Sequence, residues 1–145
     1  MYEKILVATD GSDPAERAMK DAFDLAKQLG AKVIALTVTR PWYVVAPGEL
    51  MVAFPEDEYM ASAKQLADSI LKSASEISER NGVACETIHL VQDYVYEGII
   101  GTAQQNNCDL IVMGSHGRTG LERLFLGSET QKVLSHTAIP VLVHR

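Results

Sequence analysis

The feature that most constrains the fold is the alternation of two kinds of segment along the chain of 145 residues. Short runs rich in β-branched and other aliphatic residues are typical of strands. These runs are KILVAT (4–9), KVIALTV (32–38), CETIHLV (85–91), DLIVMG (109–114) and PVLVH (140–144). Most of them lack polar alternation, which predicts strands buried on both faces.

Segments with a helical period separate these runs. Residues 14–29 place apolar side chains on one face and charged ones on the other, with Asp13 as candidate N-cap, Pro14 at the first helical position and Gly30 as the stop. The pattern returns over 56–81, a length of about 39 Å, and again over about 94–106 and about 128–137. The alternation predicts one α/β domain over 1–145, a five-stranded parallel sheet with helices on both faces and right-handed crossovers.

One stretch, residues 39–56, is longer than ordinary connections in such folds. It contains the only tryptophan, three prolines and several apolar residues. Two interpretations stay open: a partner surface or lid, and a loop folded onto its own core.

Composition excludes several classes of protein. The net charge of −6 and pI near 5.1, without a basic cluster, argue against nucleic-acid binding. Cys85 and Cys108 lack the spacing of a zinc or redox site, which favours buried, reduced thiols. A span of roughly 20 apolar residues and a secretory leader are both absent, so we expect a cytoplasmic protein without direct membrane insertion.

Polar and glycine-rich segments end two of the predicted strands, the first being Thr9-Asp10-Gly11-Ser12 at the end of 4–9. After 109–114 come Gly114, Gly117, Gly120 and Gly127, and then Ser128-Glu129-Thr130-Gln131 opens a helix. Glycines let backbone N–H groups form an anion nest, and a helix N-terminus adds further donors, so phosphate is the expected occupant. Alternatively, Ser128 and Gln131 form a capping box and the glycine loop binds nothing.

The spacing Gly114-x2-Gly117-x9-Gly127-Ser128 resembles the G-2x-G-9x-G-[S/T] signature of ATP-binding universal stress proteins. KILVATDGS, LTV, CDLIVMGSHGR, LFLGSETQKVL and IPVLV fall in that family's order along the whole chain. The resemblance implies a Rossmann-like fold of the adenine nucleotide alpha hydrolase type, with strand order 3-2-1-4-5. It also implies an adenine nucleotide, ATP, between the first and fourth strands. We expect Mg²⁺ to arrive bound to the ATP phosphates and to water rather than to side chains.

The resemblance further implies a role for each matching residue. Thr9 and Asp10 would line the adenosine side, with Asp10 toward the ribose, and Val38 would meet adenine. The remaining implied positions are Met113 and Gly114 in the same wall, Gly117, Gly127, Ser128 and Thr130 at the phosphates, and Ser115, His116 and Arg118 on the loop between. Glu129 departs from the family pattern, and we expect it either to point to solvent or to weaken triphosphate binding by repulsion.

Plainer interpretations stand beside these roles. Asp10 could cap the turn into the first helix, and His116 could contribute only its amide. Arg118 and Arg123 could be solvated charges, and Val38 and Met113 could belong to the core.

The scattered histidines and the lack of paired carboxylates beside the glycine loop do not suggest a hydrolytic site. We therefore expect a nucleotide-responsive stress or regulatory protein with at most slow ATP hydrolysis, acting on a protein partner such as a transporter, a kinase or another enzyme. The alternatives are a scaffold of the same fold that binds no nucleotide, and a slow ATPase or adenylyl-transferring enzyme. The last strand, with Pro140, Val141, Leu142 and Val143, predicts a homodimer through a sheet edge, as the resemblance also implies.

Overall fold

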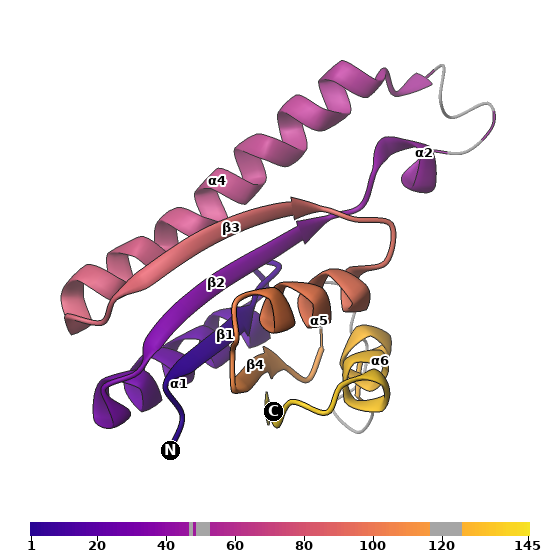
Figure 1. Cartoon of the computed structure of the whole chain (residues 1–145). Helices are drawn as coiled ribbons and strands as arrows, with labels where there is room; N and C mark the ends of the chain where they lie inside the picture. The colour runs from indigo at the N-terminus through magenta and orange to yellow at the C-terminus, as the bar shows by residue number, and fades with distance from the viewer. Residues whose placement is uncertain (47, 49–52, 117–125) are drawn as a thin grey trace.

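A computed structural model of the chain describes residues 1–46, 48, 53–116 and 126–145. Its strands are β1 (Lys4–Ala8), β2 (Lys32–Thr39), β3 (Cys85–Val91), β4 (Leu110–Gly114) and β5 (Val141–His144). All four pairings are parallel, and the order in the sheet is β3-β2-β1-β4-β5 (Figure 1). The predicted five-stranded parallel sheet and its order are confirmed.

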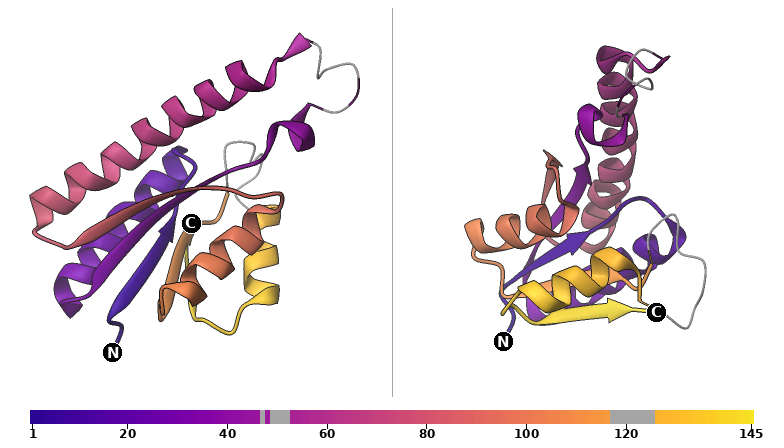
Figure 2. Two further views of the ribbon diagram at one scale, coloured as in Figure 1. Left: turned by 45° about the horizontal axis from the view of Figure 1, so that its top comes forward. Right: turned by 90° about the vertical axis from the view of Figure 1, so that its right-hand side faces the viewer.

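Helices cover both faces of the sheet (Figure 2). They are α1 (Asp13–Leu29) and α4 (Glu56–Asn81) on one face, and α5 (Val95–Gln105) and α6 (Ser128–His136) on the other. Alternate residues of a strand point to opposite faces, so Ile5 and Val7 pack beneath α1 and α4 whereas Leu6 packs beneath α5 and α6. The sheet therefore separates two hydrophobic cores.

Helix ends agree closely with the sequence prediction, with one correction. The N-cap of α1 is Ser12, not Asp13, because the Ser12 hydroxyl accepts a hydrogen bond from the Ala15 N–H at 3.4 Å. Gly30 ends α1 in the left-handed region, at φ 69°. Helix α4 spans the predicted 56–81.

The strands differ in burial more than the sequence suggests. Every residue of β4 is buried, as predicted, but β3 and β5 are mostly half-buried or exposed. Strand β3 lies at one edge of the sheet and β5 at the other, so among the described residues each has a neighbouring strand on one side only. The prediction of two buried faces is therefore wrong for the edge strands.

The irregular stretch 39–56 contains a short helix, α2 (Trp42–Val45), that the sequence did not predict. The Trp42 indole donates a hydrogen bond to the Phe54 carbonyl, and the Tyr43 hydroxyl donates to Asp93 at 2.6 Å. Tyr43, Val45 and Phe54 are nevertheless exposed. The described part of this stretch is thus anchored and also presents apolar side chains, while residues 47 and 49–52 lie outside the described residues.

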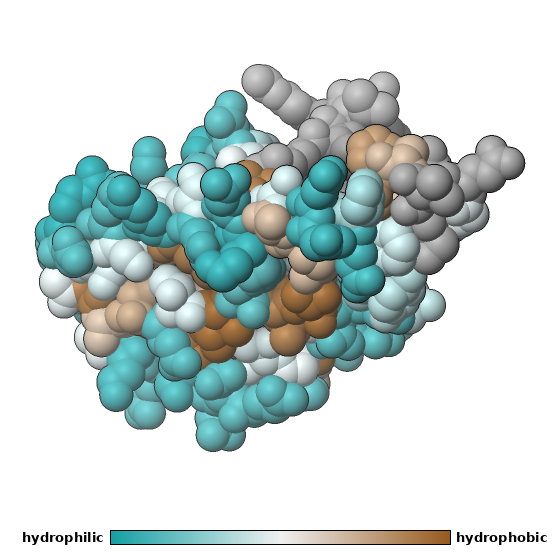
Figure 3. All heavy atoms as spheres, turned by 90° about the horizontal axis from the view of Figure 1, so that it is seen from above, coloured by the Kyte–Doolittle hydropathy of each residue, from teal (hydrophilic) through white to brown (hydrophobic). Residues whose placement is uncertain are grey.

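Both cysteines are free thiols, as predicted, although Cys85 is only half-buried. Burial raises the pKa of Cys108 to about 11. Seen from above, much of the surface is hydrophilic, with hydrophobic residues gathered in patches near its middle (Figure 3). None of the helices in the described ranges has the length and apolar character that crossing a membrane requires.

Candidate functional site

A cavity of about 340 Å³ lies beyond the carboxyl ends of β1 and β4. These strands are neighbours, but the chain continues from β1 to β2 on one side and from β4 to β5 on the other. Such a reversal of strand order is where open α/β sheets bind ligands. The lining residues are Ala8, Thr9, Asp10, Ala15, Leu36, Val38, Val95, Ile99, Met113, Gly114, His116, Gly127, Ser128, Glu129 and Thr130.

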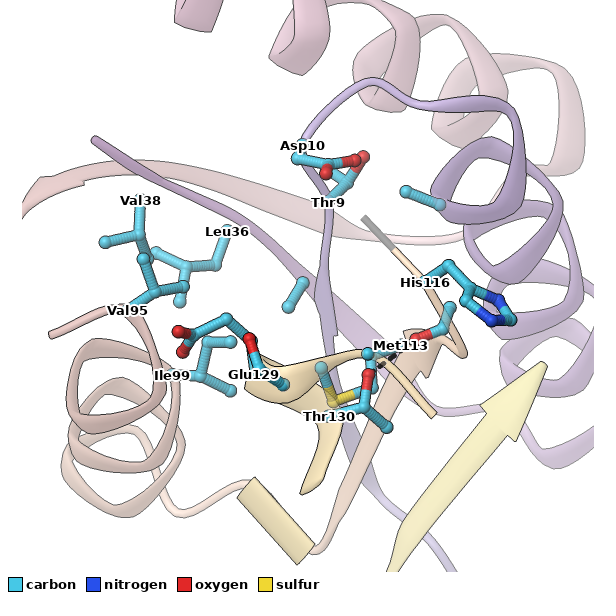
Figure 4. A pocket seen from close by; sticks show the side chains of 15 residues that line it. Thr9, Asp10, Leu36, Val38, Val95, Ile99, Met113, His116, Glu129 and Thr130 are labelled. Atoms are coloured by element: carbon cyan, nitrogen blue, oxygen red, sulfur yellow. Dashed lines mark hydrogen bonds between the residues drawn. The ribbon is translucent and has the colours of Figure 1, made fainter. Parts of the chain in front are cut away.

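One end of the cavity is apolar. Leu36 and Val38 from β2 face Val95 and Ile99 from α5, and Met113 extends this wall from β4 (Figure 4). Aliphatic side chains on opposing elements form walls that suit a flat, weakly polar group.

The other end is formed by the start of α6. Gly127 is its N-cap, and its N–H donates to the Ser115 carbonyl at 2.7 Å. The predicted alternative of a Ser128 and Gln131 capping box is wrong, because the Gln131 side chain instead donates to the Leu126 carbonyl at 2.7 Å. Ser128 lines the cavity at the first turn of the helix, where backbone N–H groups and the positive end of the helix dipole favour an anion.

Gly114 brings β4 against the first turn of α1. A Cβ at this position would lie 3.1 Å from the Pro14 carbonyl carbon and 3.2 Å from the Ala15 nitrogen. The Thr130 hydroxyl donates to the Gly114 carbonyl at 3.0 Å, and Thr130 is 3% exposed. The sequence predicted that the Thr130 hydroxyl donates to phosphate. In this structure the hydroxyl donates to the Gly114 carbonyl, and this hydrogen bond links α6 to the end of β4.

Thr9 and Asp10 form a turn at the end of β1. The Asp10 carboxylate accepts from the Ser12 N–H at 3.0 Å, and the Thr9 hydroxyl accepts from the Gly11 N–H at 3.2 Å. The plainer interpretation of Asp10 as a cap for this turn is therefore correct. Asp10 also lines the cavity, so the turn holds the carboxylate in place at its wall (Figure 4).

Of the neighbours Ser115 and His116, His116 alone lines the cavity. Ser115 is 2% exposed and lies outside the cavity lining; its hydroxyl bonds to Nδ1 of His116 at 2.7 Å. The His116 side chain does line the cavity. The predictions for Gly117 and Arg118, and for Arg123, lie outside the described residues.

The Glu129 carboxylate points toward Val95 and Ile99 and away from His116 (Figure 4). One of its oxygens accepts from the Tyr96 N–H at 3.1 Å, and the other lies 3.5 Å from Nζ of Lys132. The side chain is 39% exposed, so it is partly open to solvent as one prediction had it, while the predicted weakening of triphosphate binding stays a prediction.

Sequence reasoning missed five lining residues: Ala8, Ala15, Leu36, Val95 and Ile99. Leu36 has a detectable signal, because it lies two residues before Val38 and therefore on the same face of β2. Val95 and Ile99 lie four residues apart, on the apolar face of α5. A helix that packs on a core and a helix that lines a cavity show the same spacing of apolar residues, so the sequence does not distinguish them. Within the described residues, no group of three or more His, Cys, Asp or Glu side chains could hold a metal ion.

Comparison with known proteins identifies the class to which this fold and cavity belong. The profile described as the universal stress protein family matches residues 1–145. Universal stress protein YxiE of Bacillus subtilis is 36% identical, with all of both chains covered. Universal stress protein MJ0531 of Methanocaldococcus jannaschii is 35% identical over 99% of this chain and 82% of its own. The chain belongs to the universal stress protein family.

Solved structures support the same assignment. The structure of MJ0577, also from Methanocaldococcus jannaschii, superposes with a TM-score of 0.84 at 31% identity, covering 99% of this chain and 96% of that one. A universal stress protein solved in complex with cAMP gives 0.73 at 24% identity, over 99% and 97%. One from Archaeoglobus fulgidus in complex with dAMP gives 0.69 at 23% identity, over 99% and 98%, and for these two the likeness concerns the fold alone.

Proposed function

We propose that this chain binds an adenine nucleotide, chiefly ATP, and acts as a nucleotide-responsive regulatory protein on a protein partner such as a transporter or an enzyme. The observation that carries the proposal is the single cavity that joins apolar walls, the Asp10 carboxylate and the start of α6. The glycine spacing of the ATP-binding branch and the cAMP and dAMP bound by proteins of the same fold support it.

Each part of a nucleotide has a matching part of the cavity. The base would fit between β2 and α5, where Leu36, Val38 and Ile99 are apolar. The ribose hydroxyls would donate to Asp10, since a carboxylate accepts hydrogen bonds. The phosphates would meet the first turn of α6 beside Ser128, and Mg²⁺ would arrive bound to those phosphates and to water.

The cavity favours binding over turnover. Three of its described lining residues could act as a base, and each is already engaged: Asp10 and Glu129 accept backbone N–H groups from Ser12 and Tyr96, and Nδ1 of His116 is bonded to the Ser115 hydroxyl. A base that activates water must be positioned for that task rather than engaged in holding a turn or a helix end. We therefore expect ATP turnover slower than about 1 s⁻¹, the lower end of ordinary enzymes.

Calorimetric titration with Mg·ATP, after stripping any bound nucleotide, tests the proposal. Two variants of α6 make a matched pair, Ser128→Asp at its start and Ser135→Asp in its last turn. A new carboxylate at position 128 would repel phosphate and weaken ATP binding by about tenfold or more. The same change at the exposed position 135, outside the cavity lining, should leave the affinity unchanged.

Adenosine provides a second control, because it carries no phosphate charge. Ser128→Asp should weaken ATP binding much more than adenosine binding. If wild-type protein shows neither heat nor thermal stabilisation with millimolar ATP, ADP or AMP, the nucleotide-binding proposal is wrong. A scaffold without nucleotide would then take its place.

We also propose that the chain forms a homodimer through β5. The Pro140 and His144 carbonyls accept from the N–H groups of Ile111 in β4 and of Ser115 directly after it. Because hydrogen bonding alternates along a strand, the backbone groups of Val141 and Val143 point away from β4, toward the sheet edge. An edge of this kind is a template for pairing with a second copy.

Light scattering at tens of micromolar tests this dimer. Val143→Pro removes an N–H that points to the edge and is compatible with an edge strand, so it should yield a monomer that keeps its fold. Val143→Ala keeps the N–H and should remain a dimer. A wild-type monomer, or a dimeric Val143→Pro variant, would overturn the assignment of this interface.

A further inference from the structure

We propose that Glu129 determines which base the cavity accepts, favouring a purine with an amino group at carbon 6 over the same purine without it. The inference rests on the proposed nucleotide binding and adds a specificity residue to it. Its basis is the position of the carboxylate, at the apolar end of the cavity rather than at the phosphate end (Figure 4).

The backbone of Glu129 belongs to the first turn of α6, but its side chain reaches across to the start of α5. Tyr96 is the second residue of α5, and its N–H is one of the donors that a helix N-terminus leaves without an intrahelical partner. The N-cap residue Tyr94 offers no side-chain cap, whereas the Glu129 carboxylate accepts from the Tyr96 N–H at 3.1 Å. This contact fixes the carboxylate beside Val95 and Ile99.

The carboxylate keeps the capacity to bind a ligand. Two ionised oxygens offer about four acceptor sites, and one is used by the Tyr96 N–H. Nζ of Lys132 lies 3.5 Å from the second oxygen, and the Glu129 side chain is 39% exposed. Lys132 also lies over the Tyr96 ring, with its Nζ 5.8 Å from the ring centroid.

The chemistry at this end of the cavity is selective. Leu36, Val38, Val95 and Ile99 carry no hydrogen-bonding side chain, so among the described lining residues at this end Glu129 supplies the polar side chain. An ionised carboxylate only accepts hydrogen bonds. A 6-amino group can donate to it, whereas a purine with hydrogen at that carbon would leave the contact unmade.

The test compares the dissociation constants of ATP and purine riboside 5′-triphosphate, which lacks the amino group. Wild-type protein should bind ATP about tenfold more tightly, the effect of one hydrogen bond to a charged acceptor. The ratio should fall to about three in Glu129→Gln, which keeps a neutral acceptor, and to about one in Glu129→Ala. Glu97→Gln is the matched control, because Glu97 accepts from the Tyr96 hydroxyl outside the cavity and should leave the ratio unchanged.

The ratio of the two dissociation constants distinguishes a role of Glu129 in base specificity from a purely structural role. If Glu129 served only to cap α5, its loss would weaken both nucleotides by the same factor and the ratio would stay at the wild-type value; that result overturns the inference while ATP binding stands. If wild-type protein binds neither nucleotide, the proposed function fails and this inference with it. Should Glu129→Ala not fold, an undiminished ratio in Glu129→Gln is the result that rejects the proposal.

Discussion

Replacing Gly114 with alanine should destabilise the fold where β4 meets α1. The added methyl carbon would lie 3.1 Å from the Pro14 carbonyl carbon and 3.2 Å from both the Pro14 oxygen and the Ala15 nitrogen. These are backbone atoms of the first turn of α1, which cannot rotate away as a side chain can. Relief requires that α1 or the end of β4 shift, and Thr130 holds that end through its hydrogen bond to the Gly114 carbonyl.

Overpacking of this kind costs about 1 to 3 kcal/mol in the free energy of unfolding. For a chain of 145 residues, that loss should lower the melting temperature by about 3 to 10 °C. Urea unfolding followed by circular dichroism measures the same loss as a lower midpoint at constant slope.

Gly101→Ala is the matched control. Gly101 lies inside α5, and beyond its chain neighbours and the backbone of its own helix a Cβ there would meet no heavy atom of the described residues within 4 Å. Alanine in a helix interior should raise the stability by about 0.5 to 1 kcal/mol. The two glycine substitutions should therefore change stability in opposite directions, and a Gly114→Ala variant as stable as Gly101→Ala would refute the packing argument.

Three further outcomes follow from buried groups of the described fold. Thr130→Val keeps the shape of the side chain but removes the hydroxyl that donates to the Gly114 carbonyl, and should cost about 1 to 2 kcal/mol in urea unfolding; an unchanged free energy of unfolding would mean that water donates to the Gly114 carbonyl in the variant. Burial raises the pKa of Cys108 from its ordinary 9.0 to about 11, so between these values the thiol ionises more readily in the unfolded chain. Wild-type stability should then fall more steeply from pH 9 to pH 11 than that of Cys108→Ala, and parallel curves would contradict the assignment. Alkylation of Cys108 in the folded protein at pH 8 should be slower than after unfolding, as measured by mass spectrometry.

Local patterns predicted the helices because their signals lie within a few residues of each end. Helix α4 starts after a proline and ends at Asn81-Gly82, where Gly82 adopts φ 66°, and its observed bounds match the prediction. At α1 the prediction of Asp13 as N-cap was wrong by one residue, because the neighbouring Ser12 is an equally good N-cap. The turn held by Asp10 decides between them, since it positions Ser12 before the helix.

Strand order and the far wall of the cavity required more than local pattern. The period of a segment shows which face is apolar, but not which strand lies beside it, and the order 3-2-1-4-5 was available only from the family resemblance. Likewise, the apolar stripe of α5 predicts burial without distinguishing a core from a cavity wall. Strand-end residues such as Asp10 were easier to place, because ligands in parallel sheets meet those ends.

The short motif from Gly127 to Thr130 combines two physical roles that the sequence alone does not separate. Thr130 is buried and bonded to the end of β4, as Gly114 is packed against α1, so substitutions at these two positions should change stability first. All four residues line the cavity, but Ser128 and Glu129, the first two residues of α6, are exposed and half-buried respectively, so substitutions there should change ligand affinity or selectivity first. Because successive residues of a helix point in different directions, neighbours in one motif can serve the fold and the ligand independently. The opposite assignment, with Thr130→Val altering nucleotide selectivity and Glu129→Gln altering only stability, would show that the cavity is arranged differently when it holds a nucleotide.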